Sequence, residues 1–258
     1  MGKVILHFLS MSISDQERAL WAWQLDVPGF GEAGQKRLRD TSVLVSRVGG
    51  LGGPVAFALA AAGVGRIVLA HAGELREDDL NRQLLMTYAG LGSPRADQAA
   101  ETLRRFNPMI EVESVRENPS EENAAELVGR VDVVFGCAPL FEERFALNDA
   151  AMAQGKPYVD AAMYGMEGTV LISDGQGSPC LRCVTPEVPP FWKRRFPVIG
   201  SLSSLVGQVA VLEWIKWTCG MPGGRVGTLL RVDGSSMRID PVEIATRSGC
   251  AGCGGSHG

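Results

Sequence analysis

Two pairs of closely spaced cysteines are the residues most able to hold an ion. Cys180 and Cys183 form one C-x-x-C pair, and Cys250 and Cys253 form another near the C-terminus. Thiols at positions i and i+3 can clasp a single ion from a tight turn, and four thiolates meet the needs of a tetrahedral structural zinc. Four unligated thiols are the alternative, which the spacing disfavours. We therefore expect Zn²⁺ to pin the C-terminus to the middle of the chain.

A glycine-rich turn is the second candidate site. It separates a predicted strand at residues 42–48 from an Ala-rich helix that runs to about residue 62. Its glycines include Gly49, Gly50 and Gly52. At such a turn a nucleotide phosphate reaches backbone N–H groups and a helix N-terminus. A dinucleotide fingerprint is incomplete, because Arg47 replaces its first glycine and His71 occupies the acidic position after the second strand. This pattern disfavours a hydride-transfer enzyme.

The elements that must position these residues alternate between strand and helix patterns. Strands are predicted at residues 42–48, 66–71, 110–115, 131–137, 157–161, 168–173, 226–232 and 237–241. Helices are predicted within residues 13–40, up to residue 62, and at 95–106, 121–129, 141–154 and 205–217. This order predicts an α/β fold with a Rossmann-like, doubly wound, mostly parallel sheet and a C-terminal antiparallel portion. We expect one domain at residues 20–258, with a zinc-binding portion at about 174–253, after an N-terminal extension at 1–19.

Composition excludes several classes of function. The chain has 258 residues, of which 45% are hydrophobic, so it can bury a full core. Its net charge is −4 and its pI is near 5.5, which disfavours binding to nucleic acid or to an anionic membrane. No apolar run approaches the ~20 residues that span a bilayer. The N-terminus lacks a signal-peptide cleavage pattern, so we expect a cytoplasmic protein, and in that setting paired cysteines favour zinc over disulfides.

The chain as a whole resembles the ThiF/MoeB/HesA family, the adenylyltransferases that activate sulfur-carrier and ubiquitin-like proteins. The resemblance runs from about residue 20 to residue 253. Besides both cysteine pairs, the matching segments are 28–35, 49–52, 61–67, 80–83, 107–108, 166–170 and 207 with 213–216. It implies a homodimer, an ATP site with Mg²⁺, and a groove for a small β-grasp protein. The Gly-Gly tail of that partner would be adenylated with release of pyrophosphate.

The resemblance also assigns roles to single residues. Arg82 matches the arginine that contacts the ATP phosphates, and Arg95 stands in place of a lysine. These two arginines are the candidates for catalysis. The candidates for nucleotide binding are Gly49, Gly50, Gly52, His71, Asp79, Arg82, Gln83 and Arg95.

Several of the family's functional positions carry other residues in this chain. Pro139 replaces the aspartate associated with Mg²⁺, and Trp23 replaces an arginine that reaches across the dimer. No cysteine lies between the first cysteine pair and the long helix, where the family carries its thioester or persulfide cysteine. Asp78 and Asp79 replace Ser-Asn and should repel a triphosphate unless a metal intervenes. A single electrostatic group is often worth ~10²–10³ in rate, so ordinary adenylation should be impaired.

Three features are possible replacements, and each has a structural alternative. Asp160 either supplies a substitute carboxylate or pairs with a nearby arginine or backbone group. Arg47 either contacts an anionic ligand or pairs with the acidic loop at residues 74–79. The basic run at 193–195 either docks an acidic partner or is a solvated face.

The remaining candidates are single side chains. Cys137 and Cys219 are expected to be buried core thiols. His71 either titrates near neutral pH or caps its strand. Two functions remain open: an adenylyltransferase of the family with rearranged ATP chemistry, or a non-catalytic relative that acts as a binding or regulatory subunit.

Overall fold

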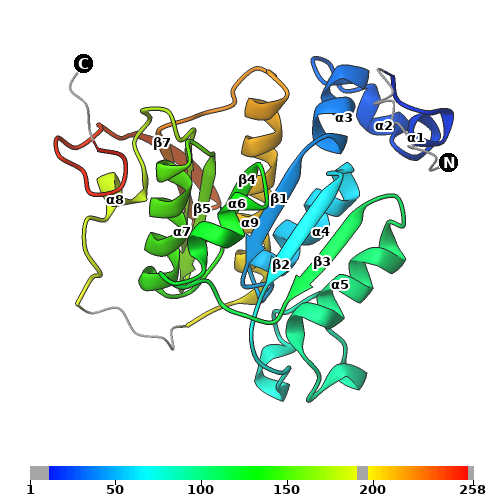
Figure 1. The fold of residues 1–258 in the computed structure, drawn as a ribbon, viewed down its shortest axis with the longest axis horizontal. Coiled ribbons are helices and arrows are strands. Elements are labelled where there is room, and N and C mark those ends of the chain that lie inside the picture. Colours follow the sequence, from blue (N-terminus) through cyan, green and yellow to red (C-terminus); the bar gives the residue numbers. More distant parts are fainter. Residues whose placement is uncertain (1–11, 191–196, 255–258) are drawn as a thin grey trace, which may run out of the picture.

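The fold is built on one mixed sheet of eight strands. The computed structural model describes residues 12–190 and 197–254. In this part of the chain the strand order is β3-β2-β1-β4-β5-β6-β7-β8 (Figure 1). The strands are β1 (Ser42–Ser46), β2 (Arg66–Ala70), β3 (Glu111–Val115), β4 (Val133–Gly136), β5 (Tyr158–Tyr164), β6 (Glu167–Ser173), β7 (Thr228–Asp233) and β8 (Arg238–Glu243). β1 to β5 pair in parallel, and β6 to β8 continue the sheet antiparallel, which confirms the predicted α/β fold.

Helices cover both faces of the parallel part of the sheet. They are α1 (Asp15–Leu20), α2 (Ala22–Leu25), α3 (Gly31–Arg39), α4 (Gly52–Ala62), α5 (Arg95–Phe106), α6 (Ala124–Gly129), α7 (Phe141–Ala153), α8 (Leu181–Val184) and α9 (Gly200–Thr218). Alternate residues of β1 enter different cores: Val43 and Val45 join the core under α4, α5 and α9, whereas Leu44 joins the core under α6 and α7. This alternation is the period-2 pattern of a strand that is buried on both sides.

The strand order reverses between β1 and β4. From β1 the chain moves outward through β2 to β3, then crosses back to place β4 on the other side of β1. The connections that leave the carboxyl ends of β1 and β4 therefore diverge to opposite faces of the sheet. In open parallel sheets such a switch point leaves a crevice that receives ligands.

Two elements, β5 and α9, extend furthest beyond the sequence pattern. β5 continues to Tyr164 and pairs with β6 across the two-residue turn Gly165-Met166, in which Gly165 has φ +60°. Glycine adopts this left-handed conformation without a steric penalty, so the hairpin closes tightly. α9 begins at Gly200 rather than at 205, because its serine-rich first turn is compatible with a helix: the Ser204 hydroxyl donates to the Gly200 carbonyl at 3.0 Å.

The N-terminal helices are attached to the end of α4. The indole Nε1 of Trp21 donates to the Ala61 carbonyl at 2.8 Å, and Gln24 donates to the Ala62 carbonyl at 2.9 Å. Residues 1–11, which belong to the predicted N-terminal extension, lie outside the described residues. Within the described ranges, no helix combines the length and apolarity needed to cross a membrane.

Packing of α4 on the sheet gives a direct test of the fold. Leu59 is completely buried, whereas Leu212 on α9 is 57% exposed. We expect Leu59→Ala to lower the free energy of unfolding by about 2–5 kcal/mol, because it leaves a cavity in a close-packed core. The matched change Leu212→Ala should lower it by less than about 0.5 kcal/mol. Urea denaturation measures both values, and equal losses would contradict this packing.

Candidate functional site

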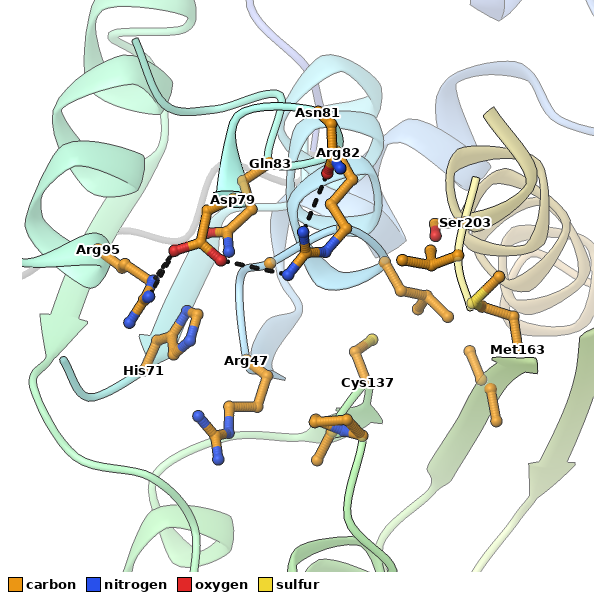
Figure 2. Close-up of a pocket in the computed structure, with 18 of the residues that line it drawn as sticks. Arg47, His71, Asp79, Asn81, Arg82, Gln83, Arg95, Cys137, Met163 and Ser203 are labelled. Atoms are coloured by element: carbon orange, nitrogen blue, oxygen red, sulfur yellow. Dashed lines mark hydrogen bonds and ion pairs between the residues drawn. The ribbon is translucent and has the colours of Figure 1, made fainter. Parts of the chain in front are cut away.

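A cavity of about 810 Å³ opens at the switch point. Its wall is formed by the turn after β1, the residues after β2 and β4, and the carboxyl half of β5 (Figure 2). All of the predicted nucleotide-binding residues line this cavity except Gly52, which is the first residue of α4. The sheet topology thus brings together residues that are far apart in the sequence.

Two positions of the glycine turn, Gly50 and Gly52, are packed too tightly to admit a side chain. A Cβ atom at Gly52 would lie 2.5 Å from the Arg47 carbonyl oxygen, and one at Gly50 would lie 2.9 Å from Arg82 Cγ. Because no side chain fits at these two positions, the backbone of the turn itself forms part of the cavity wall. α4 begins at Gly52 without a side-chain capping hydrogen bond. The positive end of its dipole is therefore available to an anion, since helix N-termini carry unpaired N–H groups.

Arg47 pairs with Glu143 rather than with the acidic loop at residues 74–79. Its Nε donates to Glu143 Oε2 at 2.7 Å, and its Nη2 donates to the other carboxylate oxygen. The predicted alternative of a pair with that loop is therefore wrong. The partner lies on α7, 96 residues away, which local sequence does not reveal. Arg47 also has φ +58°, a left-handed conformation that costs a non-glycine residue about 1 kcal/mol. The bidentate ion pair holds the side chain in the cavity wall.

A buried carboxylate joins the two predicted phosphate-binding arginines. Asp79 is 2% exposed and accepts hydrogen bonds from Arg95 Nε at 3.1 Å and from Arg82 Nη2 at 3.2 Å. Figure 2 shows Asp79 between the two guanidinium groups. Burial raises the pKa of Asp79, but the hydrogen bond from Arg95 and that from the Arg76 backbone N–H outweigh it and bring the pKa below its ordinary value. Asp79 is therefore ionised and faces two positive charges.

This arrangement corrects the expectation that Asp79 repels a triphosphate. One carboxylate shared by two guanidinium groups leaves a local excess of positive charge. Arg82 also donates to the Asp78 carbonyl at 2.6 Å and to Asn81 Oδ1 at 2.9 Å, which fixes the orientation of its plane. Asp79 thus acts as a brace that presents both arginines to the cavity, and a rigid cationic cradle binds anions with little loss of side-chain entropy.

His71 and Gln83 complete this side of the cavity with unpaired buried atoms. Both side chains are buried, and among residues 12–190 and 197–254 neither His71 Nδ1 nor Gln83 Oε1 has a hydrogen-bond partner. Burial, together with the charges of Arg47 and Arg95, lowers the pKa of His71 to about 3. The imidazole is therefore neutral at physiological pH, so the expectation that it titrates near neutrality is wrong. Buried polar atoms without partners are uncommon in folded proteins and point to a ligand or water.

The cavity does not fit a magnesium ion bound directly by the protein. In the described part of the chain the lining carboxylates are Asp78 and Asp79, and both are paired with arginines. Pro139 supplies no oxygen from its side chain, and Asp160 is engaged by Arg144. Of the two alternatives for Asp160, the structure shows the arginine pair. Mg²⁺ prefers free carboxylates and phosphate oxygens as ligands, so only the phosphates of a bound nucleotide remain.

A second, smaller cavity of about 270 Å³ adjoins the first. It lies on β5, β6 and β7, beside α7 and α8, and its wall is mostly apolar. Arg144, Ala162 and Met163 line both cavities. The two spaces therefore meet at these three residues. A chain lying over the antiparallel strands has a path from the second cavity into the first.

The four paired cysteines form one cluster. All four Sγ atoms lie within 4.8 Å of one another, with Cys180 3.7 Å from Cys250 and Cys183 3.6 Å from Cys253. A tetrahedral zinc with Zn–S bonds of ~2.3 Å separates its sulfurs by ~3.8 Å. Burial raises the pKa of Cys250, but hydrogen bonds from the backbone N–H groups of Cys253 and Gly252 outweigh it and lower the pKa to about 7. The donor set and its spacing fit zinc, and the cluster joins α8 to the C-terminal segment.

The remaining residues singled out from the sequence are two cysteines, a basic run and a tryptophan. Cys137 and Cys219 are buried, and burial raises the pKa of both thiols, as expected of core cysteines. The basic run at residues 193–195 lies outside the described residues. Trp23 is 93% exposed and does not line the cavity.

Sequence reasoning missed two charged residues near the cavity. Glu143 and Arg144 both lie in the first turn of α7, directly after β4. A signal was present, because a helix that follows a central parallel strand places its first turn beside the switch point. The buried partners of these residues come from β5 and the glycine turn, which the sequence does not reveal.

Comparison with known proteins identifies the family. The sequence profile of the ThiF family matches residues 22–252. The chain belongs to the ThiF family. It is 39% identical to the protein HesA, heterocyst, of Trichormus variabilis, over 95% of this chain and 91% of that protein. It is 33% identical to the sulfur carrier protein adenylyltransferase of Thermus thermophilus, over 90% and 89% of the two chains.

Solved structures agree with this fold. The structure of E. coli MccB with ATP superimposes with a TM-score of 0.77 at 16% identity, and covers 93% of this chain and 74% of that one. At this identity the likeness establishes the fold alone. The expected resemblance to the ThiF/MoeB/HesA family is thus confirmed.

The neutral state of His71 predicts a pH dependence of stability. The pKa of His71 is about 3 in the folded protein and 6.5 in an ordinary histidine. Between these values only the unfolded chain binds the proton, so stability is full above pH ~6.5 and falls as the pH is lowered toward 3. From about pH 6.5 to about pH 5 we expect a loss of about 2 kcal/mol in the free energy of unfolding.

The variant His71→Gln isolates this contribution. It removes the titrating group, so the difference in unfolding free energy between wild type and variant should shrink by that amount as the pH falls. Urea denaturation at several pH values measures the difference. A difference that does not change with pH would mean that the imidazole titrates in the folded protein as it does in the unfolded chain, which contradicts the low pKa.

Proposed function

We propose that this protein is a cytoplasmic adenylyltransferase that binds ATP at the switch-point cavity and activates the C-terminal carboxylate of a small sulfur-carrier protein. One observation carries the proposal: Arg82 and Arg95 converge on Asp79 directly beside the glycine turn. Two cations, the N-terminus of α4 and a glycine-rich turn together form a phosphate site. Two relatives support the reaction class, since one is named a sulfur carrier protein adenylyltransferase and the other an adenylyltransferase and sulfurtransferase.

The arginines would act on the phosphates of the nucleotide. In adenylyl transfer a carboxylate oxygen attacks the α-phosphorus, the bond to the β-phosphate breaks, and pyrophosphate leaves. Catalysis of phosphoryl chemistry rests on positioning and on neutralising charge. Arg82 and Arg95 would neutralise the leaving pyrophosphate, and the glycine turn would hold it through backbone N–H groups. Any Mg²⁺ would be held by phosphate oxygens, because the described residues that line the cavity include no free carboxylate.

The second cavity would receive the tail of the carrier. Its apolar wall on β5, β6 and β7 suits an extended chain, and it opens into the nucleotide cavity at Ala162 and Met163. A small β-grasp protein with a flexible Gly-Gly tail fits this path. We further infer a homodimer, which the resemblance to the family implies; the side chain of Trp23, 93% exposed on the N-terminal helices, offers it an apolar contact.

A binding or regulatory role without turnover is the second candidate. Specific observations favour it: Pro139 occupies the position of the metal-binding aspartate, and the exposed Trp23 carries no charge to offer a partner's site. Both candidates predict nucleotide binding at the cradle. They differ in turnover, which pyrophosphate release in the presence of candidate carrier proteins measures.

Nucleotide binding is tested by titration calorimetry with ATP. We expect micromolar binding to the wild type, with and without Mg²⁺. Arg82→Ala should weaken it by about tenfold to hundredfold, because it removes a charge-assisted hydrogen bond. The matched control Arg105→Ala removes an arginine that is 78% exposed and pairs with Glu101 away from the cavity, so it should bind as the wild type does.

Two outcomes would contradict nucleotide binding at the cradle. The first is no binding of ATP to the wild type at millimolar concentration. The second is equal affinity of the Arg82 and Arg105 variants, which would place the nucleotide elsewhere.

We also propose that the cysteine cluster holds a structural zinc. The purified protein should then contain stoichiometric zinc by elemental mass spectrometry. Cys180→Ser should lose the metal and much of the stability, since the ion joins α8 to the C-terminal segment. Cys219→Ser changes a buried thiol outside the cluster and should keep the zinc. A metal-free wild type that is as stable as a zinc-loaded one would refute the site.

A further inference from the structure

Arg144 occupies the junction between the two cavities. It lies in the first turn of α7 and is one of only three described residues that line both spaces. The other two, Ala162 and Met163, cannot hold an anion with their side chains. Arg144 is therefore the cation that stands where a ligand in one cavity would meet a ligand in the other.

The guanidinium of Arg144 is fixed on one edge. Nε donates to Asp160 Oδ1 at 2.9 Å, and Nη2 donates to Asp160 Oδ2 at 2.6 Å. The ring of Phe141 lies 4.3 Å from its central carbon, and the Tyr158 hydroxyl donates to Asp160 Oδ1 at 3.2 Å. The side chains of Arg144 and Asp160 are 4% and 3% exposed. A buried bidentate pair of this kind has little rotational freedom.

The other edge of the guanidinium is not engaged by the protein. Among the described residues, Nη1 of Arg144 has no hydrogen-bond partner, although it carries two N–H donors. The two arginines of the cationic cradle, Arg82 and Arg95, differ from Arg144 because they share one carboxylate, that of Asp79. Because Arg144 lines both cavities, this unpaired edge is available to a ligand oxygen at their junction.

We propose that Arg144 binds the C-terminal carboxylate of the acyl substrate and holds one of its oxygens toward the α-phosphate. This inference rests on the proposed function. Asp160 orients the guanidinium through Nε and Nη2, so the free Nη1 edge takes one carboxylate oxygen of the substrate. The other oxygen attacks the α-phosphorus, the new C–O–P bond forms, and the bond to pyrophosphate breaks. No proton is transferred, because the attacking carboxylate is already ionised.

The chemistry of the second cavity favours a carboxylate at this junction. Its wall is mostly apolar, and its other arginine, Arg231, has a side chain that is 59% exposed and lies 3.9 Å from Glu167. Arg231 therefore marks the outer rim. An extended apolar chain that enters at Arg231 and ends at Arg144 places its terminal negative charge on the buried arginine.

The test compares two synthetic peptides that end in Gly-Gly, one as the free acid and one as the carboxamide. Fluorescence anisotropy in the presence of saturating ATP measures their affinities. The wild type should bind the acid about tenfold to hundredfold more tightly than the amide, as expected for a charge-assisted hydrogen bond. The double variant Arg144→Gln with Asp160→Asn should bind both peptides equally, because it replaces the ion pair with neutral groups of similar shape.

Two further variants separate binding from folding. Arg144→Lys keeps a cation beside Asp160 and should retain part of the preference for the acid, so it serves if the double variant does not fold. Arg231→Gln removes the arginine at the outer rim and should leave the ratio of the two affinities unchanged. A cooperative thermal melt shows that each variant is folded.

The outcomes are distinct from those for the proposed function. If ATP binds but the wild type does not distinguish acid from amide, or binds neither peptide, the role of Arg144 is overturned while the nucleotide site stands. An unchanged ratio in the folded double variant overturns it as well. If ATP itself does not bind, the proposed function fails, and a preference for the acid measured without ATP still supports a carboxylate site at Arg144.

Discussion

The reversal of strand order between β1 and β4 is the constraint on which the site depends. Because both strands are parallel and central, their connections leave the same edge of the sheet toward opposite faces, and a crevice remains between them. The glycine turn, His71 and Cys137 all lie at this edge because each follows one of the parallel strands. A side chain at Gly50 or Gly52 would collide with Arg82 or with the Arg47 carbonyl, so local packing maintains the turn.

Two buried carboxylates then organise the charges of the crevice. Asp79 braces Arg82 and Arg95 beside the glycine turn, and Asp160 braces Arg144 at the junction with the second cavity. In both places an aspartate orients arginines instead of binding a metal. This explains how a chain with proline at the expected metal position can still present a cationic site. An arginine that is held in place in this way stabilises a nearby negative charge more strongly than a solvated arginine does in water.

The sequence predicted the framework well because the framework depends on local patterns. The run at 131–137, which is apolar apart from Asp132, predicts a buried central strand, and β4 (Val133–Gly136) is buried throughout. The helix predicted at 95–106 matches α5 in both bounds. The C-x-x-C spacing predicted the cysteine cluster, although the two pairs are separated by 66 residues. Each of these features can be recognised within a short stretch of chain.

The pairing of charged side chains could not be predicted in the same way. Arg47 and Glu143 are 96 residues apart, and only the folded sheet shows that α7 faces the glycine turn. The same holds for Asp79. From the sequence alone its carboxylate is expected to repel a triphosphate, whereas in the folded chain it pairs with two arginines. The low pKa of His71 likewise follows from burial and from cations on other elements.

The most direct test of this account is a crystal structure of the protein with a non-hydrolysable ATP analogue. The account predicts the terminal phosphates between Arg82, Arg95 and the glycine turn, with Asp79 still bound to both arginines. The α-phosphate should then lie toward Arg144. An analogue found outside the switch-point cavity, or an Asp79 that releases the arginines to bind a metal ion, would contradict it.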